Sequence, residues 1–226
     1  MSNATPPAGM EKQPDRRFDP FWLWTALQKR LSLLLRECAN TPDFAGALER
    51  LARDLQQLCR LDADVGVYVM MQIDVARYAV THAMHTAILC ELVSRRLDWA
   101  EPMRVTLVQA ALSQNIAMLE LQTVLTEQME PPSEAQREEI KTHPTRGVEL
   151  LRAAGVTDEE LLKAVAEHHE TTEGRGYPNG ISNPSKLAQL ISLCDVFSAK
   201  ISPRATRRNI EPDVAARELY LGKGGN

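Results

Sequence analysis

From residue 20 to near the end of the chain, apolar side chains recur at steps of three and four residues, and this periodicity limits the possible folds more than any other feature. It begins in two amphipathic segments, 20–38 and 41–58, whose repeating positions are mostly leucines. No alternation of β-branched and polar residues is long enough to indicate a strand. We therefore predict an all-α fold. Further helices are predicted at 62–72, 75–97, 102–113, 133–153, 157–169, 184–201 and 211–220.

The pattern divides the chain into three parts. Residues 1–19 are rich in proline, small and charged residues and are predicted to form a disordered tail. Residues 20–61 form an N-terminal helical extension, expected to act as a helical cap or to pair two chains in a homodimer. Residues 62–226 form the main domain, which ends in a glycine-rich stretch and which we expect to continue in a longer protein.

Composition excludes several classes of function. The net charge is −4, which argues against a partner such as DNA held by bulk positive charge. No apolar run approaches the roughly 18 residues that a membrane span needs, and the N-terminus lacks the apolar core of a secretory signal. The cysteines are far apart in helical stretches, which predicts reduced thiols in a cytoplasmic protein. They are Cys38, Cys59, Cys90 and Cys194.

All five histidines lie between residues 82 and 169. Histidine binds transition metals and carries protons near neutral pH, although a single helical histidine is more often an ordinary packed side chain. The adjacent pair His168-His169 leads into a loop, 170–180, that holds three glycines and a proline within seven residues. Such a loop can bring main-chain N–H groups close to a phosphate. The remaining histidines are His82, His85 and His143.

The run from His168-His169-Glu170 through Gly176-Tyr177-Pro178 to Gly180 resembles the HD-GYP domain, a branch of the HD phosphohydrolase superfamily. The resemblance extends roughly from Asp62 to Arg208 and implies an HD-domain-like helical bundle. It also implies a metal-dependent phosphodiesterase acting on cyclic di-GMP in bacterial-type signal transduction. The positions that match the family's metal ligands are His82, His143, His168, His169 and Asp195. Those expected to contact substrate or phosphate are Arg175, Gly176, Tyr177, Pro178, Arg204 and Arg207.

The sequence departs from the family at the HD dyad that gives the family its name. Gln114 stands in place of the histidine, Asn115 in place of the aspartate and Met118 in place of a following lysine. In the family, the aspartate bridges two metal ions, whereas an asparagine offers one neutral carbonyl oxygen. A glutamine amide ligates weakly, and methionine removes a cation from the vicinity of the phosphate charge. Together these changes argue against efficient two-metal hydrolysis.

A reduced metal site is still compatible with the remaining histidines. His143, His168 and His169 could hold one divalent transition metal (Fe, Mn or Zn), and the alternative is a metal-free, hydrogen-bonded histidine cluster.

Three functional hypotheses follow. The first is a degenerate HD-GYP module that binds cyclic di-GMP, or a diguanylate-cyclase (GGDEF) partner through the GYP loop, with little or no hydrolysis. The second is an active cyclic di-GMP phosphodiesterase with an altered metal site, in which His85, Glu170 or Glu173 fills the gaps. The third is a structural helical dimer with an inert pocket.

Overall fold

The structure is a computed structural model that describes residues 19–71, 78–202 and 210–222. Within these ranges the chain forms helices and no strand, which confirms the all-α prediction. The predicted tail 1–19 lies outside the described residues except for Asp19, which caps the first helix. The α-helices are α1 (Pro20–Arg36), α2 (Phe44–Leu61), α3 (Ala63–Met71), α4 (Tyr78–Arg96), α5 (Glu101–Ser113), α6 (Leu119–Glu127), α7 (Glu134–Ala153), α8 (Glu159–Glu167), α9 (Lys186–Ile201) and α10 (Pro212–Tyr220). Two 3-10 turns, η2 (Cys38–Asn40) and η4 (Ile116–Met118), lie between them.

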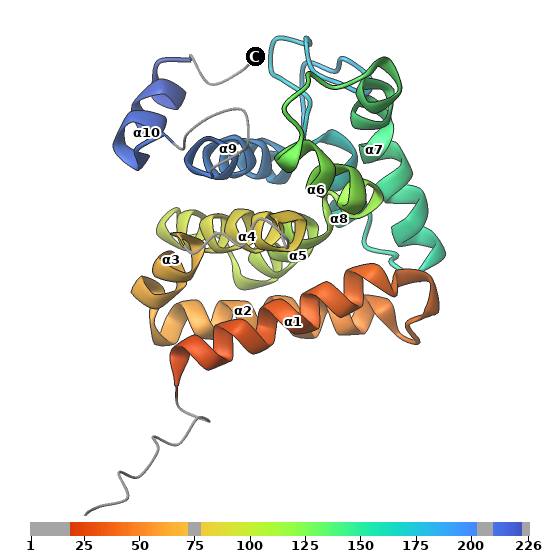
Figure 1. Cartoon of the computed structure of the whole chain (residues 1–226). Coiled ribbons are helices and arrows are strands. Elements are labelled where there is room, and N and C mark those ends of the chain that lie inside the picture. The colour runs from red at the N-terminus through yellow and green to blue at the C-terminus, as the bar shows by residue number, and fades with distance from the viewer. Residues whose placement is uncertain (1–18, 72–77, 203–209, 223–226) are drawn as a thin grey trace, which may run out of the picture.

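The helices stack in layers around α4 (Figure 1). Helices α1 and α2 form the lowest layer, α4 and α5 the middle one, and α9 lies on the opposite side of α4 from α2. The N-terminal extension is packed into the same core as the rest of the chain, because Trp24, Phe44 and Leu48 are buried in one cluster with Ile88 and Leu107. Helix α4 is buried along most of its length, so its histidines lie inside the molecule.

Most helices begin and end within a few residues of their predicted bounds. Ser133 caps α7 in a reciprocal capping box with Gln136, as expected from its hydroxyl. Two other helices, each preceded by both a threonine and an aspartate, are capped by the aspartate, whose carboxylate accepts main-chain N–H groups of the first turn. Asp43 caps α2 in place of Thr41, and Asp158 caps α8 in place of the threonine at 157.

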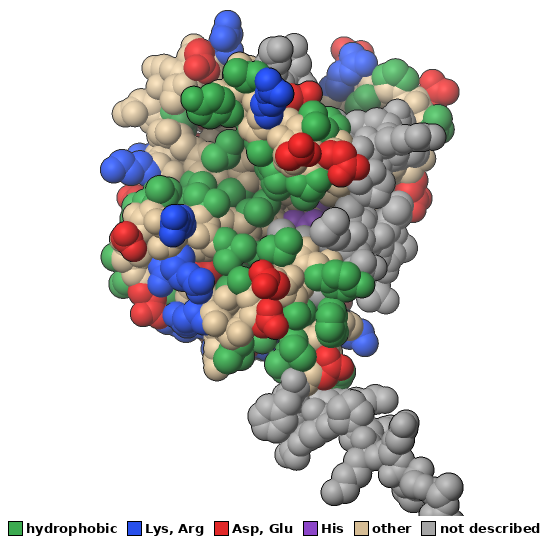
Figure 2. All heavy atoms as spheres, turned by 90° about the vertical axis from the view of Figure 1, so that its left-hand side faces the viewer, with side chains coloured by type: hydrophobic (Ala, Val, Ile, Leu, Met, Phe, Trp, Pro, Cys, Tyr) green, Lys and Arg blue, Asp and Glu red, His purple; other side chains and the backbone are tan. Residues whose placement is uncertain are grey.

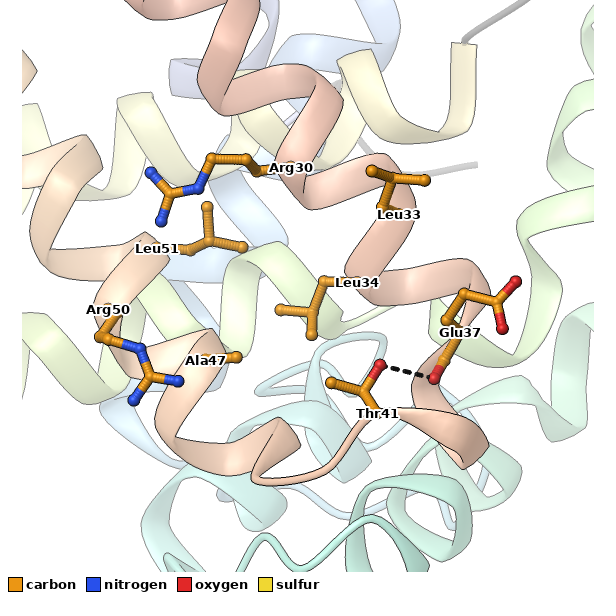
Figure 3. A pocket seen from close by; sticks show the side chains of 8 residues that line it. All are labelled: Arg30, Leu33, Leu34, Glu37, Thr41, Ala47, Arg50 and Leu51. Carbon is orange, nitrogen blue, oxygen red and sulfur yellow. Dashed lines mark hydrogen bonds between the residues drawn. The ribbon is translucent and has the colours of Figure 1, made fainter.

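The Thr41 hydroxyl instead donates to the main-chain carbonyl of Glu37, at a shallow pocket between α1 and α2 (Figure 3). Helix α6 was not predicted. Among the described residues, no helix has both the length and the apolarity that crossing a bilayer requires. All four cysteines are free and buried, as expected for reduced thiols in a core.

A buried ion pair ties the N-terminal extension to the central helices. The Glu91 carboxylate on α4 is fully buried and accepts hydrogen bonds from Arg104 on α5 and, at 2.8 Å, from the Gln56 amide on α2. A charge in the interior needs such partners, since removing one leaves the other buried and uncompensated.

We predict that Glu91→Gln lowers the free energy of unfolding by about 3–5 kcal/mol, because it leaves the Arg104 guanidinium buried without an anion. The matched control is Asp54→Asn, which breaks a 2.6 Å ion pair with Arg30 whose side chains are 43–53% exposed. That change should cost no more than about 1 kcal/mol. Urea unfolding of both variants measures the difference, and equal losses would contradict the assignment.

Candidate functional site

Three histidines converge where α7 passes the end of α8. His143 lies on α7, and His168 and His169 follow the last turn of α8, which ends at Glu167 and not at 169 as predicted. One ring nitrogen from each histidine lies within 4.8 Å of the other two. Figure 2 shows histidine atoms between hydrophobic side chains on the face that lies to the left in Figure 1.

The main chain fixes the orientation of two of these rings. His143 Nδ1 lies 2.6 Å from the Ile140 carbonyl oxygen, and His168 Nδ1 lies 2.7 Å from that of Val165. A carbonyl only accepts, so each Nδ1 donates, and the Nε2 atom of each neutral ring keeps its lone pair. These two Nε2 atoms are 3.1 Å apart. Two lone pairs facing at this distance repel each other unless a cation or a proton lies between them.

Burial disfavours the proton. It lowers the pKa of His143 to about 3, and it also lowers the pKa values of His168 and His169. The three rings are therefore neutral at pH 7 with their nitrogens turned toward one another. An imidazole whose Nδ1–H donates to a main-chain carbonyl is the usual form of a metal ligand. The cluster fits one divalent transition metal.

The other two predicted ligands are engaged with each other. His82 Nε2 on α4 donates to Asp195 Oδ1 on α9 at 2.7 Å, and the Ser198 hydroxyl lies 3.3 Å from His82 Nδ1. Gln114 Nε2 donates to the same Asp195 oxygen at 2.9 Å. Burial would raise the pKa of Asp195, but the neighbouring histidines, His82 first, hold it well below its ordinary value. The carboxylate is thus an anion with two protein donors.

Neither the glutamine nor the asparagine of this region supplies a second anion. The Gln114 and Asn115 side chains are neutral amides, and both are buried. Among the described residues, the carboxylate in contact with His82 and Gln114 is that of Asp195, and its Oδ1 already accepts a hydrogen bond from each of them.

The loop after the histidines is built around a buried carboxylate. Both Glu170 oxygens accept main-chain N–H groups, from Asn179 at 2.7 Å and from Gly180 and Ile181 at 3.1 Å. These three N–H groups are therefore not free to bind a phosphate. Both Glu170 oxygens thus contribute to holding the loop.

Gly176 and Tyr177 pack this loop against His169. A Cβ at Gly176 would lie 2.3 Å from the His169 carbonyl oxygen, so only glycine fits here. The Tyr177 ring stacks on the His169 ring with centroids 4.5 Å apart and planes 24° apart. Burial raises the pKa of Tyr177, which keeps its phenol neutral.

The remaining predicted site residues differ in their position relative to the cavity beside the histidines. Arg175 is exposed and lines the mouth of the cavity, whereas Pro178 is half-buried and does not line it. Arg204 and Arg207 lie outside the described residues. His85 is buried on α4 and is part of neither the cluster nor the cavity wall.

A cavity of about 1280 Å³ opens beside the histidines. His82, Asn115, Met118, His143, His169 and Asp195 line it together with residues that the sequence did not single out, among them Tyr78, Gln122, Leu125, Thr126, Ile140 and Lys200. Gln122, Leu125 and Thr126 belong to α6. The apolar residues at 119, 121, 124 and 125 carried a helical spacing that could have indicated this helix.

Comparison with known proteins agrees with this fold. The family model described as "HD domain" matches residues 50–224. The solved structure of Bd1817, an HDG"Y"P protein from Bdellovibrio bacteriovorus, superposes with a TM-score of 0.74 at 17% identity, covering 95% of this chain and 69% of that one. This likeness concerns the fold, and it agrees with the predicted HD-domain-like bundle.

Curated relatives share the sequence at low identity. The chain is 25% identical over 140 residues to the 3'3'-cGAMP-specific phosphodiesterase 3 of Vibrio cholerae, covering 61% of this chain and 30% of that protein. It is 25% identical over 146 residues to the cyclic di-GMP phosphodiesterase PdeB of Borreliella burgdorferi, covering 64% and 38%. It is 32% identical over 88 residues to the response regulator RpfG, a cyclic di-GMP phosphodiesterase of Xanthomonas campestris, covering 38% and 23%. The chain thus spans well under half the length of these relatives.

The buried neutral histidines predict a loss of stability in mild acid. Because the folded-state pKa of His143 is depressed and the unfolded value is about 6.5, the stabilisation is full above pH 6.5 and falls as the pH is lowered toward the folded value. For one such histidine the loss between pH 6.5 and 5 is about 2 kcal/mol. Urea unfolding of chelator-treated protein measures it. His143→Gln should show a smaller pH dependence, and an unchanged slope would contradict the prediction.

The close packing at Gly176 gives a second prediction. Gly176→Ala should displace the loop from His169 and lower the melting temperature, because its Cβ would overlap main-chain atoms that cannot move aside. Gly147→Ala on α7 is the matched control, since its Cβ would meet its nearest neighbour at an ordinary 3.5 Å. Alanine there should be neutral or stabilising, because it favours the helix by up to about 1 kcal/mol. Similar melting temperatures for the two variants would show that the loop does not depend on this contact.

Proposed function

The chain belongs to the HD domain family, and on that premise we propose that it binds a cyclic dinucleotide such as cyclic di-GMP, holds one divalent metal ion and hydrolyses its ligand little or not at all. The observation that carries this proposal is the hydrogen bond from Gln114 to Asp195. By the family resemblance, Gln114 stands at the position of a metal-binding histidine, and its neutral amide donates to a carboxylate that the resemblance makes a ligand.

The single metal is assigned to His143, His168 and His169. Their neutral rings, their orienting carbonyls and the facing Nε2 atoms support it. A divalent ion bound there would supply positive charge to a phosphate oxygen. Arg175 at the cavity mouth is exposed and can add a guanidinium contact to the same phosphate. We extend this role to Arg204 and Arg207 by resemblance alone.

Other residues of the chain order the site around that ion. Tyr177 stacks on His169 and restricts its ring, while the Glu170 carboxylate holds the loop that carries Tyr177. His82 and Gln114 both donate to Asp195 Oδ1 and so fix the orientation of its carboxylate. The cyclic dinucleotide enters the proposal from the relatives, whose names describe phosphodiesterases for cyclic di-GMP and 3'3'-cGAMP.

The second candidate is an active phosphodiesterase with one metal. It is favoured by the intact histidine cluster and by the activity of the relatives. The two candidates differ in whether the chain hydrolyses its ligand. The first is preferred because the chain lacks both the acidic bridge and the lysine that the family resemblance expects near the phosphate.

We predict that the purified full chain contains one equivalent of transition metal by elemental analysis, binds cyclic di-GMP by calorimetry, and releases no linear product by chromatography. His143→Gln should abolish the metal, because it removes a ligand. His85→Gln is the matched control, a buried histidine on α4 that lies outside the cluster, and it should keep the metal.

Restoring the dyad extends the same test. Gln114→His, Asn115→Asp and Met118→Lys in one chain should raise the metal content to two equivalents, since they return an imidazole and an acidic bridge. Two equivalents and turnover in the unaltered chain would overturn the proposal. One equivalent with turnover would favour the second candidate.

A further inference from the structure

One wall of the cavity is formed by the helix that the sequence did not predict. Gln122 lies four residues after Met118, and Leu125 and Thr126 lie three and four residues after Gln122, so these side chains share one side of η4 and α6, and all four residues line the cavity. The cavity, at about 1280 Å³, exceeds the roughly 300–1,000 Å³ of typical small-molecule pockets. It has room for a ligand that reaches from the histidines to this wall.

Two residues that line the cavity carry an amide oxygen with no hydrogen-bond partner in the described part of the chain. These oxygens are Asn115 Oδ1 and Gln122 Oε1, on side chains that are 5% and 8% exposed. The nearby Thr126 hydroxyl does not serve Gln122 Oε1, because it donates to the main-chain carbonyl of Gln122 at 2.8 Å. A buried acceptor without a donor costs about 1–3 kcal/mol. N–H or O–H groups of a ligand in the cavity would therefore stabilise these two oxygens.

The side chains on either side of Gln122 can pack against the faces of a planar heterocycle. Met118 lies one turn before it and Leu125 about one turn after it, both on the cavity wall. A methionine thioether packs well against an aromatic face, and an aliphatic side chain offers a second apolar contact. Side-chain amides between apolar contacts recognise base edges by hydrogen bonding. Because the unpartnered atoms are acceptors, the complementary edge carries donors. Guanine presents two adjacent ones, N1–H and the exocyclic amine, whereas the adenine edge presents one.

We propose that the α6 wall is a nucleobase subsite, in which Gln122 Oε1 accepts a hydrogen bond from a guanine base of the ligand and Met118 and Leu125 contact its faces. This inference rests on the proposed cyclic dinucleotide ligand and adds the residue that sets base preference. Asn115 Oδ1 is the second acceptor of the same subsite, and the histidine cluster is the place of the phosphate.

The test is calorimetric titration of the full chain with cyclic di-GMP, GMP and IMP, the last of which lacks the exocyclic amine. The unaltered chain should bind GMP more tightly than IMP. Gln122→Leu, which keeps the side chain's approximate size, should weaken cyclic di-GMP binding about ten- to hundredfold and remove the preference for GMP over IMP. Gln57→Leu on α2 is the matched control, the same substitution at an exposed position, and it should change neither quantity.

The outcomes separate this inference from the proposed function. Equal affinities of the unaltered chain and Gln122→Leu for cyclic di-GMP overturn the base subsite and leave the proposed function standing. Gln122-dependent binding of GMP without binding of cyclic di-GMP keeps the subsite and overturns the proposed ligand. Binding of none of the three nucleotides by the unaltered chain overturns both. Loss of the preference for GMP distinguishes direct recognition from a merely structural role of Gln122.

Discussion

The Asp195 carboxylate joins three helices, and the arrangement of the whole site depends on its hydrogen bonds. It extends from α9 and accepts from His82 on α4 and from Gln114 at the end of α5. A buried anion is stable only with donors or a cation beside it, and here both donors come from the chain itself. The central layer is therefore held to α9 by a polar contact that requires no metal.

This contact divides the site into two chemically different halves. On one side, His82 Nε2 and Gln114 Nε2 both donate to Asp195 Oδ1. On the other, His143 and His168 present lone pairs to each other across 3.1 Å, an arrangement that a divalent cation would stabilise. The Glu170 carboxylate belongs to neither half, because it binds main-chain N–H groups of the loop and so maintains the stack of Tyr177 on His169.

Much of the fold could be predicted from the sequence because the buried face of a helix requires apolar residues at every third or fourth position, and this spacing can be seen locally. The histidine cluster could also be predicted, since His168 and His169 are adjacent at the end of α8 and His143 on α7 matches a ligand position of the family that the sequence resembles. Helix α6 was missed because it has only nine residues and is followed by a proline pair, so its periodicity is short. The bond between Gln114 and Asp195 joins positions 81 residues apart, and no local pattern records such a contact. The role of Glu170 was hidden for a related reason, because a carboxylate beside a histidine pair suggests a ligand until the positions of the loop N–H groups are known.

The distribution of charge explains why a neutral dyad and a one-metal site belong together. In the described part of the chain, Asp195 is the carboxylate that contacts His82 and Gln114, and Asn115 is neutral at the position where the family resemblance expects the acidic bridge. Two divalent ions beside a single, already hydrogen-bonded carboxylate would leave a large uncompensated positive charge in a buried site, which is costly in a low-dielectric interior. One ion on three neutral imidazoles leaves a modest positive charge, which the phosphate of an anionic ligand can neutralise on binding. In the proposed function such a site retains the anion, and the unpartnered oxygens of Asn115 and Gln122, two residues that line the same cavity, would hold the rest of that ligand in place.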